Sequence, residues 1–371
     1  MGSGLKKTSK YVIKKSNSEV IIIKVNSIRY KEWKIENDEK KFKHSIKRKK
    51  AKKEKKRLKL AIYKPSPSFV SKKQKKINKI VPENFSIITN PEETIEFFED
   101  VSREIVDINN KGANIFLDMK NVKNITVDAL MYLIARIKSI RENSSTVYSI
   151  GGNLPLNEEC KKLVKESGFL EHVNTTNIKT IRNYNKIRIR SGDKVESTVI
   201  KDIIDFIKED EFVINTKKLY TVIGEIMKNS IHHAYDINDE HKQKWLLFVE
   251  KTVDRYKFTL LDTGLSIPYT VNKKVVLEAF KKDSSLLISA LNGFEMRTQT
   301  KQMNRGKGLP EVKASVTSGF INSMNIISRK AYCRLQDRTI TRSNELRIGL
   351  MGTLYYWEIL FNNEEVRYDN N

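Results

Sequence analysis

The chain has 371 residues, a formal net charge of +25 and an isoelectric point near 9.7. This excess favours a polyanionic partner, such as nucleic acid, an anionic membrane surface or an acidic protein. Cys160 and Cys333 are far apart and lack metal-ligand spacing, which gives no basis for a disulfide framework or a zinc site. No apolar run reaches about 18 residues and no signal-peptide pattern is present, so we expect a cytoplasmic protein without a transmembrane segment.

Residues 1–85 are expected to form a basic extension that is partly disordered or helical. Glu19–Ile28 is rich in β-branched residues and predicts a short strand. Lysine and arginine dominate Lys40–Lys59, where Glu54 is the only acid. We expect Lys40–Lys79 to bind nucleic acid, RNA or DNA, largely without sequence preference because aromatic residues are almost absent from it. The alternative is a solvated tail without a partner.

Residues 86–190 alternate helical and extended patterns. Asn90 and Pro91 predict a helix start, with asparagine as the cap and proline in the first turn. The pattern then predicts helices over 91–108, 127–141 and 156–167, and strands over 114–119 and 146–152. Such alternation indicates a small α/β domain with at least two strands joined by a crossover.

The order of these elements resembles a STAS domain, the fold of anti-sigma-factor antagonists. In that family a serine or threonine at the start of a helix can be phosphorylated, and Thr126 in Lys123–Leu130 occupies the matching place. The family's Asp-Ser-Ser-Gly pattern is absent, and a helix cap is the alternative role for Thr126. The resemblance implies a STAS-like domain that binds a protein partner.

Residues 195–371 are expected to form a second α/β domain. The patterns predict helices over 195–208, 216–235, 275–290 and 309–318, and strands over 245–251, 256–262, 321–328, 331–336 and 353–360. Thr252–Arg255 joins the first two of these strands as a hairpin. The polar stretch Asn292–Arg305 has no apolar period and is a candidate mobile lid.

The helix over 216–235 carries a carboxylate and a carboxamide on one face. Ile223, Ile226 and Met227 recur at helical spacing, which predicts an apolar stripe. Glu225 and Asn229 are four residues apart, so they lie one turn apart on one side of the helix. This pair can activate a water molecule and hold a hydrated metal; the alternative is an ordinary surface helix.

Two later segments accompany this pair. Leu260–Pro268 places Asp262 and Gly264 at the end of an apolar strand, and Asn304–Pro310 places two glycines and two cations before a helix. The three segments, in this order and spacing, resemble the N, G1 and G2 boxes of the GHKL ATPase superfamily. The resemblance implies a two-layer α/β sandwich of the Bergerat type, with helices on one face of a mixed sheet and a nucleotide held between the helices and the lid.

The resemblance also implies a role for each matching residue. Glu225 would be the catalytic base and Asn229 the ligand of Mg²⁺. Asp262 would accept a hydrogen bond from the adenine amine of ATP, Gly264 would let the base approach the backbone, and Thr353 on a late strand would support Asp262. The expected phosphate-binding residues are Arg305, Gly306, Lys307 and Gly308.

Some positions depart from the family pattern. Ser266 stands where many members have a second glycine. His232 and His233 follow Asn229 closely, and we expect them to be packed or surface residues rather than phosphoacceptors. No dimerisation helix with a phosphoacceptor histidine is recognisable, which argues against a conventional sensor kinase.

Three functions are compatible with these observations. The first, which we favour, is an Mg²⁺-dependent ATPase acting as an ATP-driven conformational switch, and it is compatible with a homodimer. The second is an anti-sigma-factor-like serine/threonine kinase that phosphorylates or regulates a STAS domain. The third is a non-catalytic adaptor that binds nucleic acid.

Overall fold

The protein divides into two compact units, Met1–Lys73 and Gln74–Asn371. The structure, a computed structural model, describes residues 11–16, 19–24, 75–107, 113–143, 149–173, 183–209, 214–232, 245–272, 282–293 and 308–361. In the first unit β1 (Tyr11–Ser16) pairs antiparallel with β2 (Glu19–Lys24). The strand predicted at Glu19 is therefore confirmed, whereas β1 was not predicted. Most of the basic run Lys40–Lys79 lies outside the described residues.

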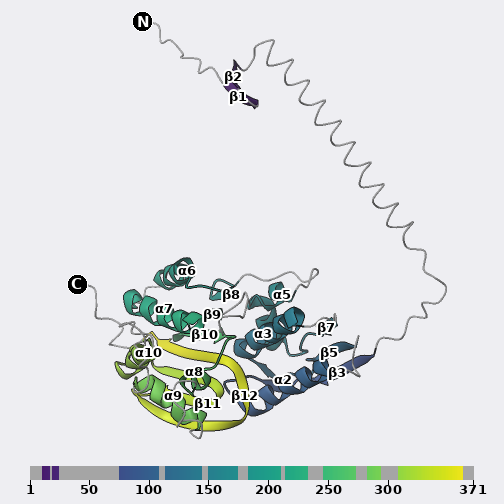
Figure 1. The fold of residues 1–371 in the computed structure, drawn as a ribbon, viewed down its shortest axis with the longest axis vertical. Helices are drawn as coiled ribbons and strands as arrows, with labels where there is room; N and C mark the ends of the chain where they lie inside the picture. The colour runs from purple at the N-terminus through teal and green to yellow at the C-terminus, as the bar shows by residue number, and fades with distance from the viewer. Residues whose placement is uncertain are drawn as a thin grey trace, which may run out of the picture. The chain divides into compact units, whose positions relative to one another are not determined.

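The second unit begins with an α/β module, which we define as residues 75–173. Its elements are β3 (Lys76–Ile80), β4 (Asn84–Phe85), α2 (Pro91–Val106), β5 (Asn114–Asp118), β6 (Asn124–Ile125), α3 (Val127–Asn143), β7 (Ser149–Gly152), α4 (Glu158–Glu166) and α5 (Phe169–His172). Strands β3, β5 and β7 form a parallel sheet in the order β3-β5-β7. The predicted crossover is confirmed, because α3 joins the parallel strands β5 and β7 (Figure 1).

Two details at the start of this module differ from expectation. The sheet begins before residue 86, since β3 lies in the segment expected to belong to the basic extension. Asn90 precedes α2 but its side chain makes no capping hydrogen bond. Its amide donates instead to the Asn84 carbonyl oxygen at 3.0 Å and to Glu93 Oε2 at 2.6 Å. Asn90 thereby ties the start of α2 to β4.

The rest of the unit is built on one five-stranded sheet. Its strands are β8 (Lys186–Gly192), β9 (Trp245–Lys251), β10 (Arg255–Asp262), β11 (Ser323–Gln336) and β12 (Thr339–Leu360), in the order β11-β12-β10-β9-β8. Every pairing in it is antiparallel, so the expected mixed sheet is wrong for the described strands. The accompanying helices are α6 (Ser197–Lys208), α7 (Thr216–His232), α8 (Ile267–Asn272), α9 (Asp283–Asn292) and α10 (Gly308–Thr317).

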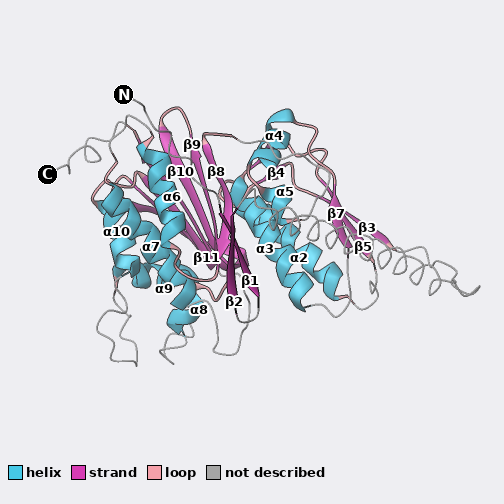
Figure 2. Cartoon of the chain, turned by 90° about the horizontal axis from the view of Figure 1, so that it is seen from above, coloured by secondary structure: helices cyan, strands magenta, loops and turns pink. Residues whose placement is uncertain are grey.

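The two faces of this sheet are covered by different helices (Figure 2). The helix face, with Leu247, Leu260 and Tyr355, shares a buried core with α6–α10. The module face, with Leu246, Leu261 and Leu354, shares a second core with the α/β module. The sheet therefore lies between the helices α6–α10 on one face and the α/β module on the other.

Polar contacts also join the module to the sheet. Tyr132 on α3 accepts a hydrogen bond from the Met351 amide at 3.1 Å. Arg347 forms ion pairs with Glu92 and Glu96 on α2 at 3.4 and 3.3 Å. Within the described part of the chain, no helix is both long and apolar enough to cross a membrane.

Candidate functional site

The carboxylate and the carboxamide of α7 lie on the side of the helix that faces α10. Ile223, Ile226 and Met227 are fully buried, which fixes the opposite stripe of α7 against the sheet. The Glu225 side chain is 19% exposed, and its Oε1 pairs with Lys228. Asn229 has a buried Nδ2 atom without a hydrogen-bond partner among the described residues. A buried amide without a partner costs free energy, so this position suits a bound ligand.

Gly308, the first residue of α10, lies directly against this pair. A Cβ atom at Gly308 would stand 2.8 Å from Glu225 Oε2 and 3.2 Å from Asn229 Oδ1. No larger residue fits there without displacing those side chains. The structure thus brings together the glycine from the third sequence segment and both polar residues from the first. The N-terminus of a helix, with its free amide groups, points positive charge towards them.

Asp262 and Thr353 form a second buried group at the ends of β10 and β12. The two residues are opposite each other in the register, and Asp262 is only 4% exposed. Burial raises the pKa of Asp262 to about 7, against the lowering effect of hydrogen bonds from the Gly264 amide and from Thr353. The Gly264 amide donates to Asp262 Oδ1 at 3.0 Å. Asp262 is therefore held in a fixed orientation in an environment that disfavours its charge.

A chain of hydroxyl groups supports this second group. Thr353 Oγ1 lies 2.9 Å from Ser328 Oγ, and Ser328 Oγ accepts a hydrogen bond from the Ile267 amide at 2.9 Å. Ser266 directly precedes α8 (Ile267–Asn272), a helix that was not predicted, and its hydroxyl oxygen accepts a hydrogen bond from the Tyr269 amide at 3.4 Å. The serine that departs from the family pattern therefore has a structural role as a helix cap.

Gly352 is a residue of this site that sequence reasoning missed. Its φ is +86°, and a Cβ atom there would stand 2.0 Å from the carbonyl oxygen of Asp262. Only glycine allows β12 to pass β10 so closely at this point. The Gly-Thr pair at 352–353, next to the predicted Thr353, is the signal in the sequence that indicates this position.

The two groups lie on the same side of the sheet. Asp262 follows Leu260 with the period of two of a strand, so it faces the helices, as Leu260 does. Tyr355 is also on this face, and the charge of Asp262 adds to the burial that raises its pKa. No hydrogen bond or ion pair between described residues joins Asp262 to Glu225.

Other expected site residues are placed elsewhere or are not described. Arg305, Gly306, Lys307, His233 and the candidate lid from residue 294 onward lie outside the described residues. Thr126 precedes α3, and its hydroxyl oxygen is buried, so a phosphoacceptor role would require this helix start to open. Thr126 also lines a cavity of about 640 Å³ between the module and the sheet, which contains none of the residues expected to bind nucleotide.

The residues present fit a metal ion that takes most of its ligands from a bound nucleotide and water and only one from the protein. Among the described residues, no group of three or more histidine, cysteine, aspartate or glutamate side chains is arranged to hold an ion. Asn229 offers one oxygen ligand, which suits Mg²⁺ that takes its other ligands from phosphate and water.

Comparisons with known proteins add no assignment. No protein-family model matches the chain, and no curated protein matches it. The functional argument therefore depends on the residues and on their geometry.

Proposed function

We propose that the chain is an ATP-binding protein of the GHKL type, with a Bergerat-like fold, that acts as an ATP-driven conformational switch. The observation that carries the proposal is the contact of Gly308 with Glu225 and Asn229 at the start of α10. Gly308 follows Glu225 and Asn229 by about 80 positions in the sequence, and the GHKL resemblance implies that these residues share one site. The buried Asp262–Thr353 pair on the same side of the sheet supplies the second half of the site.

Asp262 would recognise the adenine base. In its ionised form it only accepts hydrogen bonds, which matches the exocyclic amine of adenine. Thr353 and the Gly264 amide hold its carboxylate in place. Gly264 itself would allow the base to lie close to the backbone.

The start of α10 would bind the phosphates. Its free amide groups and helix dipole favour an anion, and Arg305 and Lys307 precede it in the sequence. Asn229 would hold Mg²⁺, which when bound neutralises phosphate charge. Glu225, with one oxygen on Lys228 and the other towards Gly308, would orient or deprotonate the attacking water.

The layered architecture supports a switch rather than a simple hydrolase. α10 packs against α7 and against β11, so a shift of α10 on nucleotide binding would act on the central sheet. The other face of that sheet packs on the STAS-like module, the proposed site for a protein partner. The basic segment Lys40–Lys79 would contact nucleic acid, RNA or DNA.

Incubation with γ-labelled ATP and Mg²⁺ tests this function. Release of free phosphate supports the ATPase, label on the protein supports the kinase alternative, and the absence of turnover supports the adaptor. Glu225→Ala should abolish turnover while ATP still binds. Glu209→Ala, which removes an exposed carboxylate from the end of α6, is the matched control and should leave turnover unchanged. Turnover by the Glu225 variant would show that the assigned base is wrong.

A further inference from the structure

Strands β11 and β12 continue beyond the central sheet as a bent hairpin, which we name the distal hairpin and define as residues 329–347. The register shifts on both sides of Arg329, whose φ is +54°. Tyr332 donates a hydrogen bond to Asn325 Oδ1 at 3.0 Å, although seven residues of straight strand would span about 23 Å. The strand is therefore folded sharply at Arg329.

The distal hairpin is rich in exposed cations, namely Arg329, Lys330, Arg334, Arg338, Arg342 and Arg347. Those at its base are paired, since Arg329 lies 3.5 Å from Asp283 and Arg347 contacts α2. Arg334 and Arg342 are different, because neither has an acidic partner among the described residues. Their positive charge is available to an outside anion.

Arg334 and Arg342 also stand directly opposite each other in the register of β11 and β12. Like charges at opposite positions of an antiparallel pair destabilise the sheet. The Arg342 guanidinium lies 4.8 Å from the centre of the Tyr332 ring, which holds it over the strand. An anion bound between the two arginines would relieve their repulsion.

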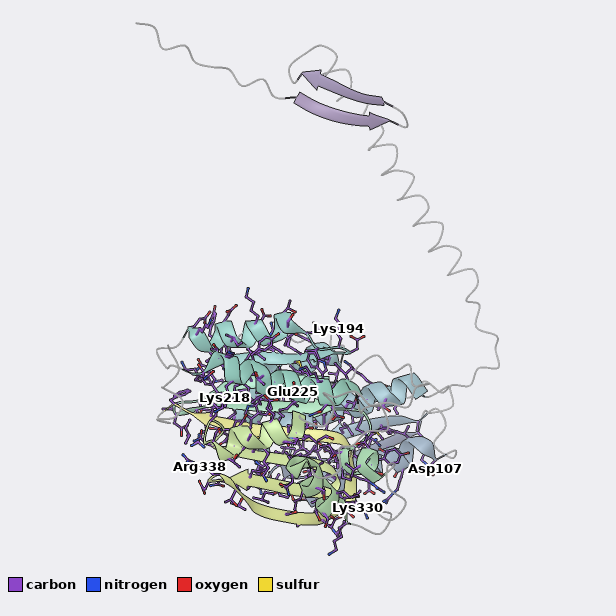
Figure 3. All side chains as sticks on the ribbon, turned by 60° about the vertical axis from the view of Figure 1, so that its left-hand side comes forward. Asp107, Lys194, Lys218, Glu225, Lys330 and Arg338 are labelled. Carbon is purple, nitrogen blue, oxygen red and sulfur yellow. The ribbon has the colours of Figure 1, made fainter. Side chains whose placement is uncertain are left out.

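The turn of the hairpin adds a third arginine in an unusual conformation. Asp337 and Arg338 form a two-residue turn with φ values of +51° and +65°. Such turns favour glycine at the second position, because a side chain in the left-handed region is strained. Figure 3 labels Arg338 and Lys330, which come from the turn and from the bend of this hairpin. Arg338 therefore stands at a position of the turn where the backbone conformation favours glycine.

A hollow of about 350 Å³ lies between the turn and the beginning of β11. Its lining includes Arg255, Arg334, Arg338, Asn322, Ser323 and Gln336. Glu358 and Asp337 also line it, and Arg255 is itself paired with Glu358 at 2.7 Å and with Asp254 at 2.5 Å. Guanidinium and amide or hydroxyl donors in one concave site match a phosphate group.

We propose that the distal hairpin binds the phosphate backbone of a nucleic acid, with a phosphate group in the arginine-lined hollow. This inference is independent of the ATPase proposal and concerns a different part of the sequence from Lys40–Lys79. Tyr332 is 4% exposed and cannot stack on a base, so binding should not depend on sequence. An acidic protein is disfavoured, because the described residues of the hairpin expose no large apolar side chain for an interface core.

The test measures binding of the full chain to a fluorescent 20-nucleotide single strand and to the matching duplex between 50 and 200 mM KCl. The variant R334S/R342S removes two charges, and K201S/K208S, on the exposed side of α6, is the control of equal charge. We expect the hairpin variant to bind about tenfold more weakly than the wild type. The slope of log affinity against log salt concentration should become less steep by roughly 1.5 to 2. The control should change affinity less than twofold. Equal behaviour of the two variants overturns the proposal.

Two further measurements separate the remaining explanations. If polyglutamate binding depends on Arg334 and Arg342 while nucleic acid binding does not, an acidic protein is the partner and the proposal fails. Arg338→Gly should reduce nucleic acid affinity severalfold without lowering the urea midpoint, because glycine suits the turn. Binding of this variant at the wild-type level would remove the hollow from the site.

Discussion

Replacing Asp262 by asparagine should stabilise the protein at pH 8 and change its stability little near pH 4. The pKa of Asp262 is raised by burial from 3.8 to about 7. A raised pKa means that the folded state binds the proton more tightly than the unfolded state. The stability that protonated Asp262 gives to the folded state is fully present below about pH 4 and is lost as the pH rises through 7. Asparagine carries no charge, so it avoids this loss.

The size of the effect follows from the pKa difference. The difference between 3.8 and about 7 is about 3 units, and at about 1.4 kcal/mol per unit it corresponds to roughly 4 kcal/mol above pH 7. The asparagine oxygen can still accept from the Gly264 amide, so this contact is retained. The asparagine amide must find its own partner, and we therefore expect a net gain of about 2 kcal/mol at pH 8.

Urea unfolding at pH 4.5, 6 and 8 measures this gain. The free energy of unfolding of the variant minus that of the wild type should rise steadily with pH. Asp202→Asn on α6, where the carboxylate is exposed, is the control and should give a difference near zero at each pH. A constant difference for Asp262→Asn at the three pH values would refute the argument that burial controls the charge of this residue.

Three other outcomes follow from the same site, and Gly224→Ala serves as a control for one of them. ATP affinity of the wild type should rise from pH 6 to pH 8, because ionised Asp262 accepts a stronger hydrogen bond from the adenine amine than the protonated acid does; a flat profile by calorimetry would contradict this. Gly308→Ala should lower turnover and cost about 1 kcal/mol of stability by displacing the α7 side chains. Gly224→Ala, with its nearest neighbour at 4.0 Å, should instead stabilise α7 by about 0.5 kcal/mol. Gly352→Ala should lower the free energy of unfolding in urea by about 3 kcal/mol or more. The alanine would have a strained left-handed backbone, and its Cβ atom would overlap the carbonyl oxygen of Asp262.

The parts of the fold that the sequence predicts are those set by local pattern. The period of α7, the β9–β10 hairpin and the α3 crossover were all predicted within a few residues. For these elements the apolar residues that define the pattern lie close together in the sequence. The meeting of Glu225, Asn229 and Gly308 was implied instead by the resemblance of their segments to the GHKL superfamily.

The parts that were missed depend on distant partners. Lys76–Ile80 reads as a basic tail, yet it forms β3, in which Lys76 lies 4.1 Å from the Phe116 ring and Lys79 pairs with Glu104 at 2.9 Å. β8 pairs with β9 across more than 50 residues of sequence. The first half of β12 is polar and extended only because β11 lies beside it. Single-sequence reasoning cannot weigh such contacts.

The module face of the central sheet has a practical consequence for anyone who dissects this protein. A fragment that starts at residue 195 would discard β8 and strip the cover from Leu246, Leu261 and Leu354. Such a fragment would expose a wide hydrophobic surface to water and should aggregate at the concentrations used for crystallisation or spectroscopy. The α/β module and the central sheet should therefore be expressed together. A binding partner that separated them would have to cover the exposed face of the sheet itself.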